Sequence, residues 1–259
     1  MRRFLLTTAL VGAAAFAAPA YAAVNLVTNG SFEDPTPGSG LTGWTIGGTD
    51  GQGYPPVAIY YGAAAAYPIG AFNEAVPANN AATNSPDAVG ARAAYFVTDL
   101  ATDQSLTQMV FLTAGTYQIG FSAYAPRNGY GNAGDATFQG VVASVTLANY
   151  SVHGGIAATW QTFAGATTIA TDGLYEVKFV FNTALFPSAD VVIDQVYIIA
   201  SNPPIPTPEP ATLALLGMGL AGLALQHPLA GELARLDLLQ DGLHPLLHLG
   251  ADDARPAGV

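Results

Sequence analysis

The sequence predicts an all-β fold, a β-sandwich of the jelly-roll type. Between the two ends of the chain, no long window places apolar residues at helical spacing. Several short runs instead alternate apolar and polar residues, as a strand with one buried face does. Turn signals rich in Gly and Asn separate these runs, and about ten short strands at this spacing are typical of sandwiches and jelly rolls.

Residues 1–22 have the pattern of a signal peptide. Arg2 and Arg3 form a positive start, residues 4–18 are apolar, and Ala20-Tyr21-Ala22 is a small-x-small cleavage site. Cleavage there would leave Ala23 as the first residue of the mature protein. The alternative is an uncut membrane helix, but the short apolar region and the well-formed cleavage site favour removal.

Residues 23–202 are expected to form the sandwich domain. The alternation is clearest in YEVKFVF at residues 175–181, where Tyr175, Val177, Phe179 and Phe181 share one face. Ala114-Gly115, Asn128-Gly129 and Asp172-Gly173 are turn signals between strands. The expected strands are 25–27, 44–46, 57–61, 92–97, 106–112, 116–124, 141–147, 160–163, 175–181 and 191–199.

Two long insertions interrupt this rhythm. Residues 62–90 are rich in Ala, Asn and Pro, and residues 127–135 are rich in Gly and Asn. Long loops on a sandwich scaffold are usually either functional or mobile, so both are candidate ligand-binding segments.

The composition excludes several classes of function. The chain has 18 acidic and 7 basic residues and a formal net charge of −11. Within the expected domain the only basic residues are Arg92, Arg127 and Lys178, so its surface should repel nucleic acid and anionic lipid headgroups. The chain has no cysteine, which excludes disulfides, thiolate metal sites and cysteine nucleophiles.

The C-terminal region combines a Pro-rich spacer with an apolar segment, a pattern that bears on where the protein is sent. A Pro-rich spacer at 203–210 ends in Pro208, Glu209 and Pro210, and residues 211–225 form an unbroken apolar run. As a helix this run spans roughly 22 Å, against about 30 Å for a membrane hydrocarbon core. The run is therefore short for a permanent membrane span.

This region resembles the PEP-CTERM sorting signal of exported bacterial proteins, which combines a Pro-Glu-Pro motif, an apolar helix and a short Arg-rich end. The resemblance implies an exosortase-type processing enzyme as partner, a transient association with the inner membrane during processing, and a final location at the cell surface or outside the cell. The Arg-rich end is missing, because the chain continues with Gln226, His227 and Pro228.

Residues 226–259 differ from the rest of the chain. They contain no Ser, Thr, Asn, Tyr or Phe, and are dominated by residue types that GC-rich codons encode. We interpret this atypical tail as a shifted reading frame. The alternative is a natural amphipathic segment with Leu229, Leu233 and Leu236 on one helical face.

The expected domain also resembles a known family. NLVTNGSFE at 25–33, GWTI at 43–46, GARAAY at 90–95, LTQMVFLTAGTYQIGF at 106–121 and VIDQVYI at 192–198 are similar to segments of galactose-binding-like domains and related carbohydrate-binding modules. The resemblance spans most of residues 23–200. It implies a non-catalytic sandwich in which the first and last strands lie together, with polysaccharide as a candidate partner.

The same resemblance implies a structural Ca²⁺ held by Glu33 and Asp194 with backbone carbonyls. The alternative is that Glu33 ends a strand and Asp194 caps a turn. Asp194 lies in an otherwise apolar run, where an unpaired carboxylate would be costly, so it needs a partner of some kind.

Candidate glycan contacts are aromatic and polar residues in or near loops, because aromatic faces stack on the apolar faces of sugar rings. We single out Tyr54, Tyr61, Arg127, Asn128 and Tyr130. Core packing is the competing explanation for the tyrosines, and a solvated hairpin tip explains Arg127 and Asn128 better than a ligand role does.

The sequence offers little catalytic equipment, and no catalytic residue is assigned. His153 is the only histidine of the expected domain, and no Gly-x-Ser-x-Gly motif occurs. A carboxylate pair for glycoside hydrolysis stays open, since sequence does not show distances. The leading hypothesis is a non-enzymatic, exported glycan-binding protein, and the alternative is a structural matrix or biofilm protein without a specific ligand.

Overall fold

The computed structural model describes residues 23–34, 40–87 and 90–201. The predicted signal peptide with Ala20 and Ala22, the Pro-rich spacer with Pro208, Glu209 and Pro210, the sorting helix at 211–225 and the tail at 226–259 lie outside the described residues. Among the described residues, no helix has the length and apolar character needed to cross a membrane.

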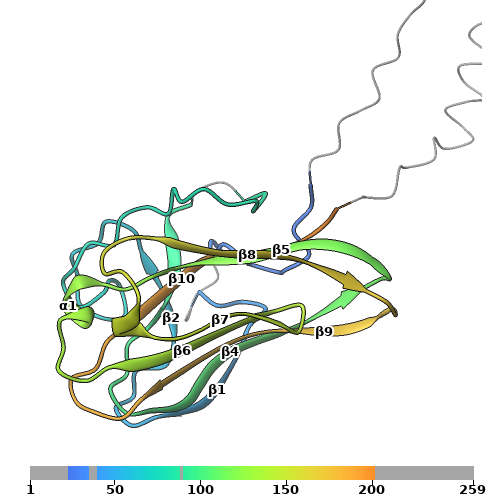
Figure 1. Ribbon diagram of the computed structural model, residues 1–259. Coiled ribbons are helices and arrows are strands. Elements are labelled where there is room, and N and C mark those ends of the chain that lie inside the picture. Colours follow the sequence, from blue (N-terminus) through green and yellow to red (C-terminus); the bar gives the residue numbers. More distant parts are fainter. Residues whose placement is uncertain (1–22, 35–39, 88–89, 202–259) are drawn as a thin grey trace, which may run out of the picture. The chain divides into compact units, whose positions relative to one another are not determined.

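Two five-stranded antiparallel sheets face each other, so the predicted all-β sandwich is confirmed (Figure 1). The first sheet has the order β1-β4-β9-β6-β7. It consists of β1 (Thr45–Asp50), β4 (Ala101–Leu112), β9 (Gly173–Thr183), β6 (Ala136–Val142) and β7 (Val145–Ser151). The second has the order β2-β3-β10-β5-β8, with β2 (Val57–Tyr60), β3 (Arg92–Phe96), β10 (Val191–Ala200), β5 (Gly115–Tyr124) and β8 (Gln161–Ile169).

The main core fills the space between the sheets. Val177, Phe179 and Phe181 of β9 are fully buried in it, as the alternation in the sequence predicts. Phe179 packs edge-to-face on Phe121 of β5, with ring centroids 5.0 Å apart. Large aromatic side chains from both sheets thus meet in the centre of this core.

A second, smaller core lies on the outer face of the second sheet. Ala71 and Val76, from the long β2–β3 connection, are buried there against Tyr95 of β3 and Val192 of β10. Trp160 donates from its Nε1 to the Pro77 oxygen at 3.0 Å and helps to fix this connection. The described part of the predicted insertion at 62–90 therefore packs on the outer face of the second sheet. Because the main core lies on the other face, β10 is buried on both faces.

One expected strand is a hairpin instead. Residues 141–147 are split by a turn at Ala143 and Ser144, both with positive φ, which join β6 to β7. This two-residue turn has the backbone that favours Gly or Asn, and neither is present to signal it. Ser144 compensates through tertiary bonds, donating its N–H to the Glu176 oxygen at 2.8 Å and accepting the Glu176 N–H at 3.1 Å.

The expected first strand at 25–27 also differs. This segment lies beside β10, with Leu26 donating to the Ile198 oxygen at 2.9 Å, but it is not a regular strand. The Asn25 side chain takes over part of the ladder, because its Oδ1 accepts the N–H groups of Val27 and Ile198. The two ends of the domain nevertheless lie together, as the resemblance implies.

Candidate binding pocket

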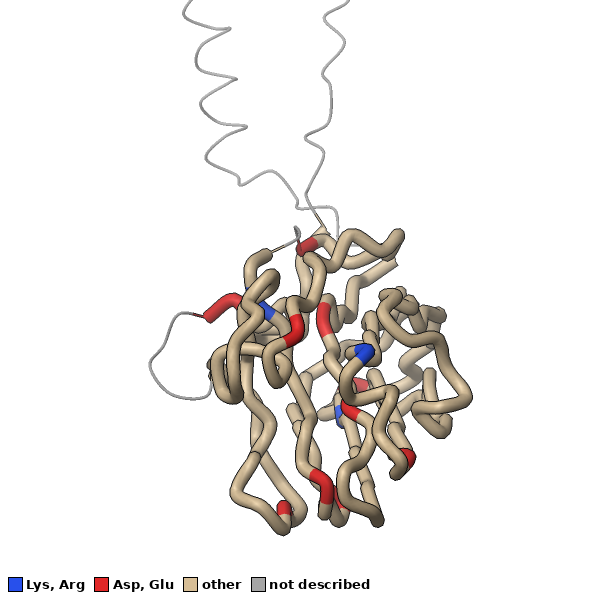
Figure 2. The backbone as a smooth tube through the Cα atoms, turned by 90° about the vertical axis from the view of Figure 1, so that its left-hand side faces the viewer, with Lys and Arg blue, Asp and Glu red and all other residues tan. Residues whose placement is uncertain are grey.

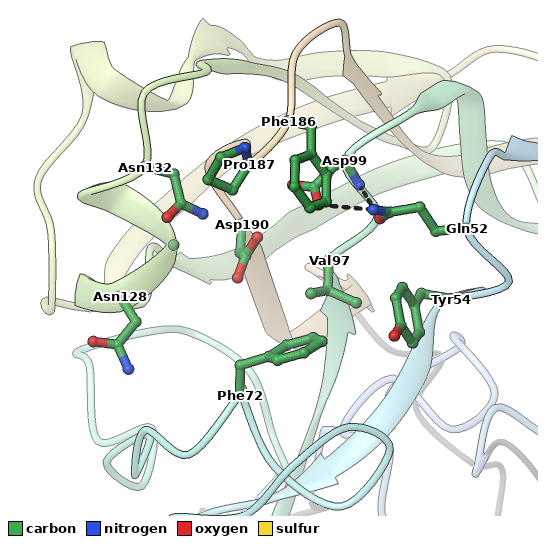
Figure 3. A pocket seen from close by; sticks show the side chains of 11 residues that line it. Gln52, Tyr54, Phe72, Val97, Asp99, Asn128, Asn132, Phe186, Pro187 and Asp190 are labelled. Atoms are coloured by element: carbon green, nitrogen blue, oxygen red, sulfur yellow. Dashed lines mark hydrogen bonds between the residues drawn. The ribbon is translucent and has the colours of Figure 1, made fainter.

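A pocket of about 360 Å³ opens at one end of the sandwich. The connections between β1 and β2, β2 and β3, β3 and β4, β5 and β6, and β9 and β10 all contribute to it. The β5–β6 connection contains the single-turn helix α1 (Arg127–Tyr130). The residues that line the pocket are Gln52, Tyr54, Phe72, Val97, Asp99, Asn128, Gly129, Asn132, Phe186, Pro187 and Asp190 (Figure 3).

Aromatic side chains form part of the pocket wall. The Tyr54 ring meets Phe72 edge-on at 5.8 Å and Tyr67 edge-on at 4.9 Å between ring centroids. Phe72 is 40% exposed and Phe186 is 71% exposed. Exposed aromatic rings at the mouth of a pocket present apolar faces that a ligand can cover.

Hydrogen bonds fix the polar side of the pocket. Gln52 donates from Nε2 to the Asp99 carboxylate at 3.0 Å, while the Asp99 N–H donates to Gln52 Oε1 at 2.8 Å (Figure 3). The other oxygen of Asp99 accepts the Ser188 N–H at 2.5 Å. Asn132 donates to the Ser188 oxygen at 2.5 Å. The β1–β2, β3–β4, β5–β6 and β9–β10 connections are thereby tied to one another.

Asp190 lies deeper, and it is only 6% exposed. Its Oδ2 accepts the hydroxyl of the buried Tyr95 at 2.6 Å. Burial raises the pKa of Asp190 to about 7, with further increases from the negative charges of Asp99 and Glu74 and an opposing effect of the Tyr95 hydrogen bond. Gly129 permits this arrangement, since a Cβ there would lie 2.5 Å from the Asp190 carboxyl carbon.

The predicted ligand residues separate into two groups. Tyr54 and Asn128 line the pocket together, although they are far apart in sequence. Arg127 lies beside Asn128 in α1, and Glu74 accepts the backbone N–H groups of both at 2.8 and 2.6 Å. Tyr130 is not among the residues that line the pocket, and its hydroxyl donates to the backbone oxygen of His153 at 2.9 Å.

Tyr61 lies under the β2–β3 connection, where its hydroxyl donates to Asp194 Oδ2. Asn79 also donates to this oxygen, at 3.2 Å. Asp194 is 1% exposed, and its second oxygen, Oδ1, is buried without a hydrogen-bond partner. Burial raises the pKa of Asp194 to about 7, and the charge of Glu33 adds to that rise.

The calcium site stays a prediction, and the residues fit it in part. The orphaned Asp194 Oδ1 is the hard oxygen that calcium prefers, and Glu33 lies within electrostatic reach. Glu33 Oε1, however, already accepts the N–H groups of Ala91 and Arg92 at 2.7 and 2.6 Å. Within the described residues no three acidic or histidine side chains form a metal-binding cluster. Backbone carbonyls would have to supply the remaining ligands.

His153 contacts Asp135, with 3.8 Å between its Nδ1 and the carboxylate. Ser151 donates its hydroxyl to Asp135 and not to the imidazole. A serine nucleophile needs a histidine that accepts its proton, so this trio is not arranged as a catalytic triad.

Sequence reasoning missed Phe72, Phe186, Asp99 and Asp190 as pocket residues. Phe72 and Phe186 lie in long connections, where a large aromatic residue without alternating neighbours is a usable signal. Asp190 carries no such signal, because it directly precedes an apolar strand and its position at the pocket depends on the packing of α1.

The described part of the chain is thus a two-sheet β-sandwich with a polar and aromatic pocket at its loop end. Residues 206–226 match the PEP-CTERM protein-sorting motif. That motif indicates export and membrane-associated sorting.

Comparison with solved structures gives low-identity similarities to carbohydrate-binding modules. One is TmCBM61 in complex with β-1,4-galactotriose, with 15% identity, a TM-score of 0.44 and coverage of 69% of this chain and 99% of that one. Another is the CBM22-1 xylan-binding domain of Paenibacillus barcinonensis Xyn10C, with 14% identity, a TM-score of 0.37 and coverage of 71% and 99%. No curated protein matches the chain.

Proposed function

We propose that this protein is an exported, non-enzymatic glycan-binding protein, and that the pocket at the loop end of the sandwich holds the glycan. The sorting motif carries the export half of the proposal. An exosortase-type enzyme would process the C-terminal signal at the inner membrane, and the mature domain would then act at the cell surface or in the extracellular matrix.

The observation that carries the binding half is the composition of the pocket. Phe72, Phe186 and Tyr54 offer apolar faces, and Gln52, Asn128 and Asn132 offer amide groups within the same 360 Å³ space. A sugar ring has apolar faces and a rim of hydroxyl groups, so it is complementary to such a wall. The size is at the lower end of the range for small-molecule pockets, which suits one or two sugar rings.

Binding is favoured over hydrolysis by the state of the carboxylates. Asp99 and Asp190 both line the pocket, and a carboxylate pair is the equipment of a glycoside hydrolase. Both oxygens of Asp99 already accept hydrogen bonds from Gln52 and Ser188, which assigns it to holding the loops. Release of reducing sugar from a bound polysaccharide would overturn the non-enzymatic assignment.

The test uses the domain at residues 23–202, which contains all the buried core residues of the described part of the chain. Polysaccharide pull-down and a glycan array should detect retention on at least one glycan. Phe72→Ala and Phe186→Ala should each weaken that binding roughly tenfold, which corresponds to about 1.4 kcal/mol.

Phe111→Ala is the matched control, because Phe111 is 60% exposed on β4 and is not among the pocket residues. It should bind as the unchanged domain does. Equal loss in the control would show non-specific adhesion. A domain retained on no glycan would favour the alternative, a structural matrix protein without a specific ligand.

A further inference from the structure

The charges of the pocket deepen the proposed function, on which the following inference rests. We infer that the glycan carries a protonated amine, as a de-N-acetylated amino sugar does, and that Asp190 receives this amine. The pocket would accordingly reject uronic acids.

Asp190 is a buried carboxylate whose positive partner is missing from the domain. Tyr95 satisfies its Oδ2, but no lysine or arginine of the described residues forms an ion pair with it. A carboxylate that is 6% exposed is costly to ionise unless a cation approaches it. Since Asp190 lines the pocket, a ligand that enters the pocket can supply that cation.

The groups around Asp190 make the pocket negative. Asp99 from the β3–β4 connection and Glu74 from the β2–β3 connection both raise the pKa of Asp190 through their charges, in addition to the larger effect of burial. From β3 only the neutral Tyr95 hydroxyl meets it, and from α1 the backbone of Gly129 packs on it. Arg127, the one basic residue of α1, is not among the lining residues.

The whole domain has the same sign, with acidic residues spread over the fold and few basic ones between them (Figure 2). A uronate would meet repulsion from Asp99, would oppose the ionisation of Asp190, and would find no lysine or arginine among the described lining residues. A neutral sugar would leave Asp190 unpaired. An ammonium group next to the ring hydroxyls would gain a charge-assisted hydrogen bond, while the ring itself still meets Phe72 and Tyr54.

Three hexasaccharides test this selectivity by titration calorimetry at pH 6. They are made of glucosamine, of N-acetylglucosamine and of galacturonic acid, so the first two differ only in the amine. We expect the glucosamine hexamer to bind at least tenfold more tightly than the N-acetylated hexamer, and the galacturonic acid hexamer to show no binding.

Asp190→Asn should reduce that preference to near unity, because the amide keeps the shape and the acceptor for Tyr95 but cannot ionise to pair with an ammonium group. Asp103→Asn is the matched control, since it makes the same substitution at an exposed position of β4 outside the pocket. It should keep the tenfold preference. A preference lost equally in both variants would assign it to the net charge of the domain and would overturn the inference.

Three further outcomes would overturn the inference, and only one of them would also overturn the proposed function. Equal or tighter binding of the N-acetylated hexamer would overturn the inference and leave glycan binding standing. Binding of no glycan, in the hexamer set or on the array, would overturn both. A lysine tetrapeptide that binds as tightly as the glucosamine hexamer would show that charge alone is recognised, which would also overturn the inference.

Discussion

Asp190 and Asp194 are matched at the residue scale. Each is buried, each accepts a tyrosine hydroxyl through its Oδ2, and burial raises the pKa of each to about 7. They differ in what lies beside the second oxygen. Asp190 borders the open pocket, whereas Asp194 Oδ1 is enclosed beneath the β2–β3 connection. The first carboxylate therefore borders space that a ligand can enter, whereas the second is closed off from that space.

These two residues predict how stability changes with pH. The pKa of each carboxyl group is about 7 in the folded state, above the ordinary value of about 4. As the pH rises, both groups therefore stay protonated to a higher pH in the folded state than in the unfolded state. Their contribution is fully present below pH 4 and is lost as the pH rises to about 7. Each pH unit between the two pKa values corresponds to about 1.4 kcal/mol.

Urea unfolding at pH 4.5, 5.5 and 7 in the presence of chelator measures this contribution. A variant with both Asp190→Asn and Asp194→Asn should lose less stability across that range than the unchanged domain. The exposed Asp103→Asn should follow the unchanged domain. The same decline in all three proteins would show that neither buried carboxylate titrates in this window.

Calcium should stabilise the domain through Asp194. A cation that binds only the folded state at a hundredfold excess over its Kd adds about 2.7 kcal/mol. The melting temperature should then rise with calcium and fall with chelator, and Asp194→Asn should remove the response. A melting temperature indifferent to both additions would show that Glu33 and Asp194 hold no calcium.

At the element scale, a glycine in β6 permits a close contact between the two sheets. Gly140 of β6 faces Phe121 of β5, and a Cβ at this position would lie 2.3 Å from the Phe121 ring. The ring is fully buried and stacks on Phe163 at 5.1 Å, so it has little room to move. The close contact between β6 and β5 at this point therefore depends on the absence of a side chain at Gly140.

Gly140→Ala should therefore destabilise the domain by about 1–3 kcal/mol through overpacking. Gly154→Ala is the control, because nothing lies within 4 Å of a Cβ there. Thermal unfolding of the two variants should separate them clearly. Equal melting temperatures would mean that Phe121 can shift without cost.

At the scale of the whole molecule, the C-terminal signal departs from the pattern it resembles, because no Arg cluster directly follows residues 211–225. A sorting helix needs a basic stop on its cytoplasmic side, and Gln226, His227 and Pro228 stand where that stop is due. Inserting three or four Arg residues after Leu225 should increase membrane insertion and processing. Fractionation and immunoblotting of the two forms in an exosortase-positive host measure the effect.

The same number of Ser residues inserted after Leu225 is the control and should change neither step. Unchanged processing with Arg would show that residues 226–259 provide a functional end of their own. The frame-shift interpretation is tested on the DNA, where an alternative frame within about ten codons of Leu225 should encode several Arg residues and then stop.

The periodicity of the sequence determined the fold class, because alternation along a strand is a local property that needs no knowledge of the partner strand. Val177, Phe179 and Phe181 could be assigned to the core in this way. The sorting motif could be found for the same reason, since its residues are contiguous in sequence. The acidic character of the domain also follows from composition alone.

Only the tertiary structure determined which residues line the pocket and which acidic side chains are buried. Phe72, Asp99 and Phe186 come from three separate connections, and no local pattern shows that these connections meet at one end of the sandwich. Asp194 lies in a strand whose sequence is largely apolar. Its burial depends on the β2–β3 connection, more than a hundred residues earlier in the sequence, from which Asn79 donates a hydrogen bond to it. Long-range packing fixes such positions, because the energy that selects them is gained only when distant segments close on one another.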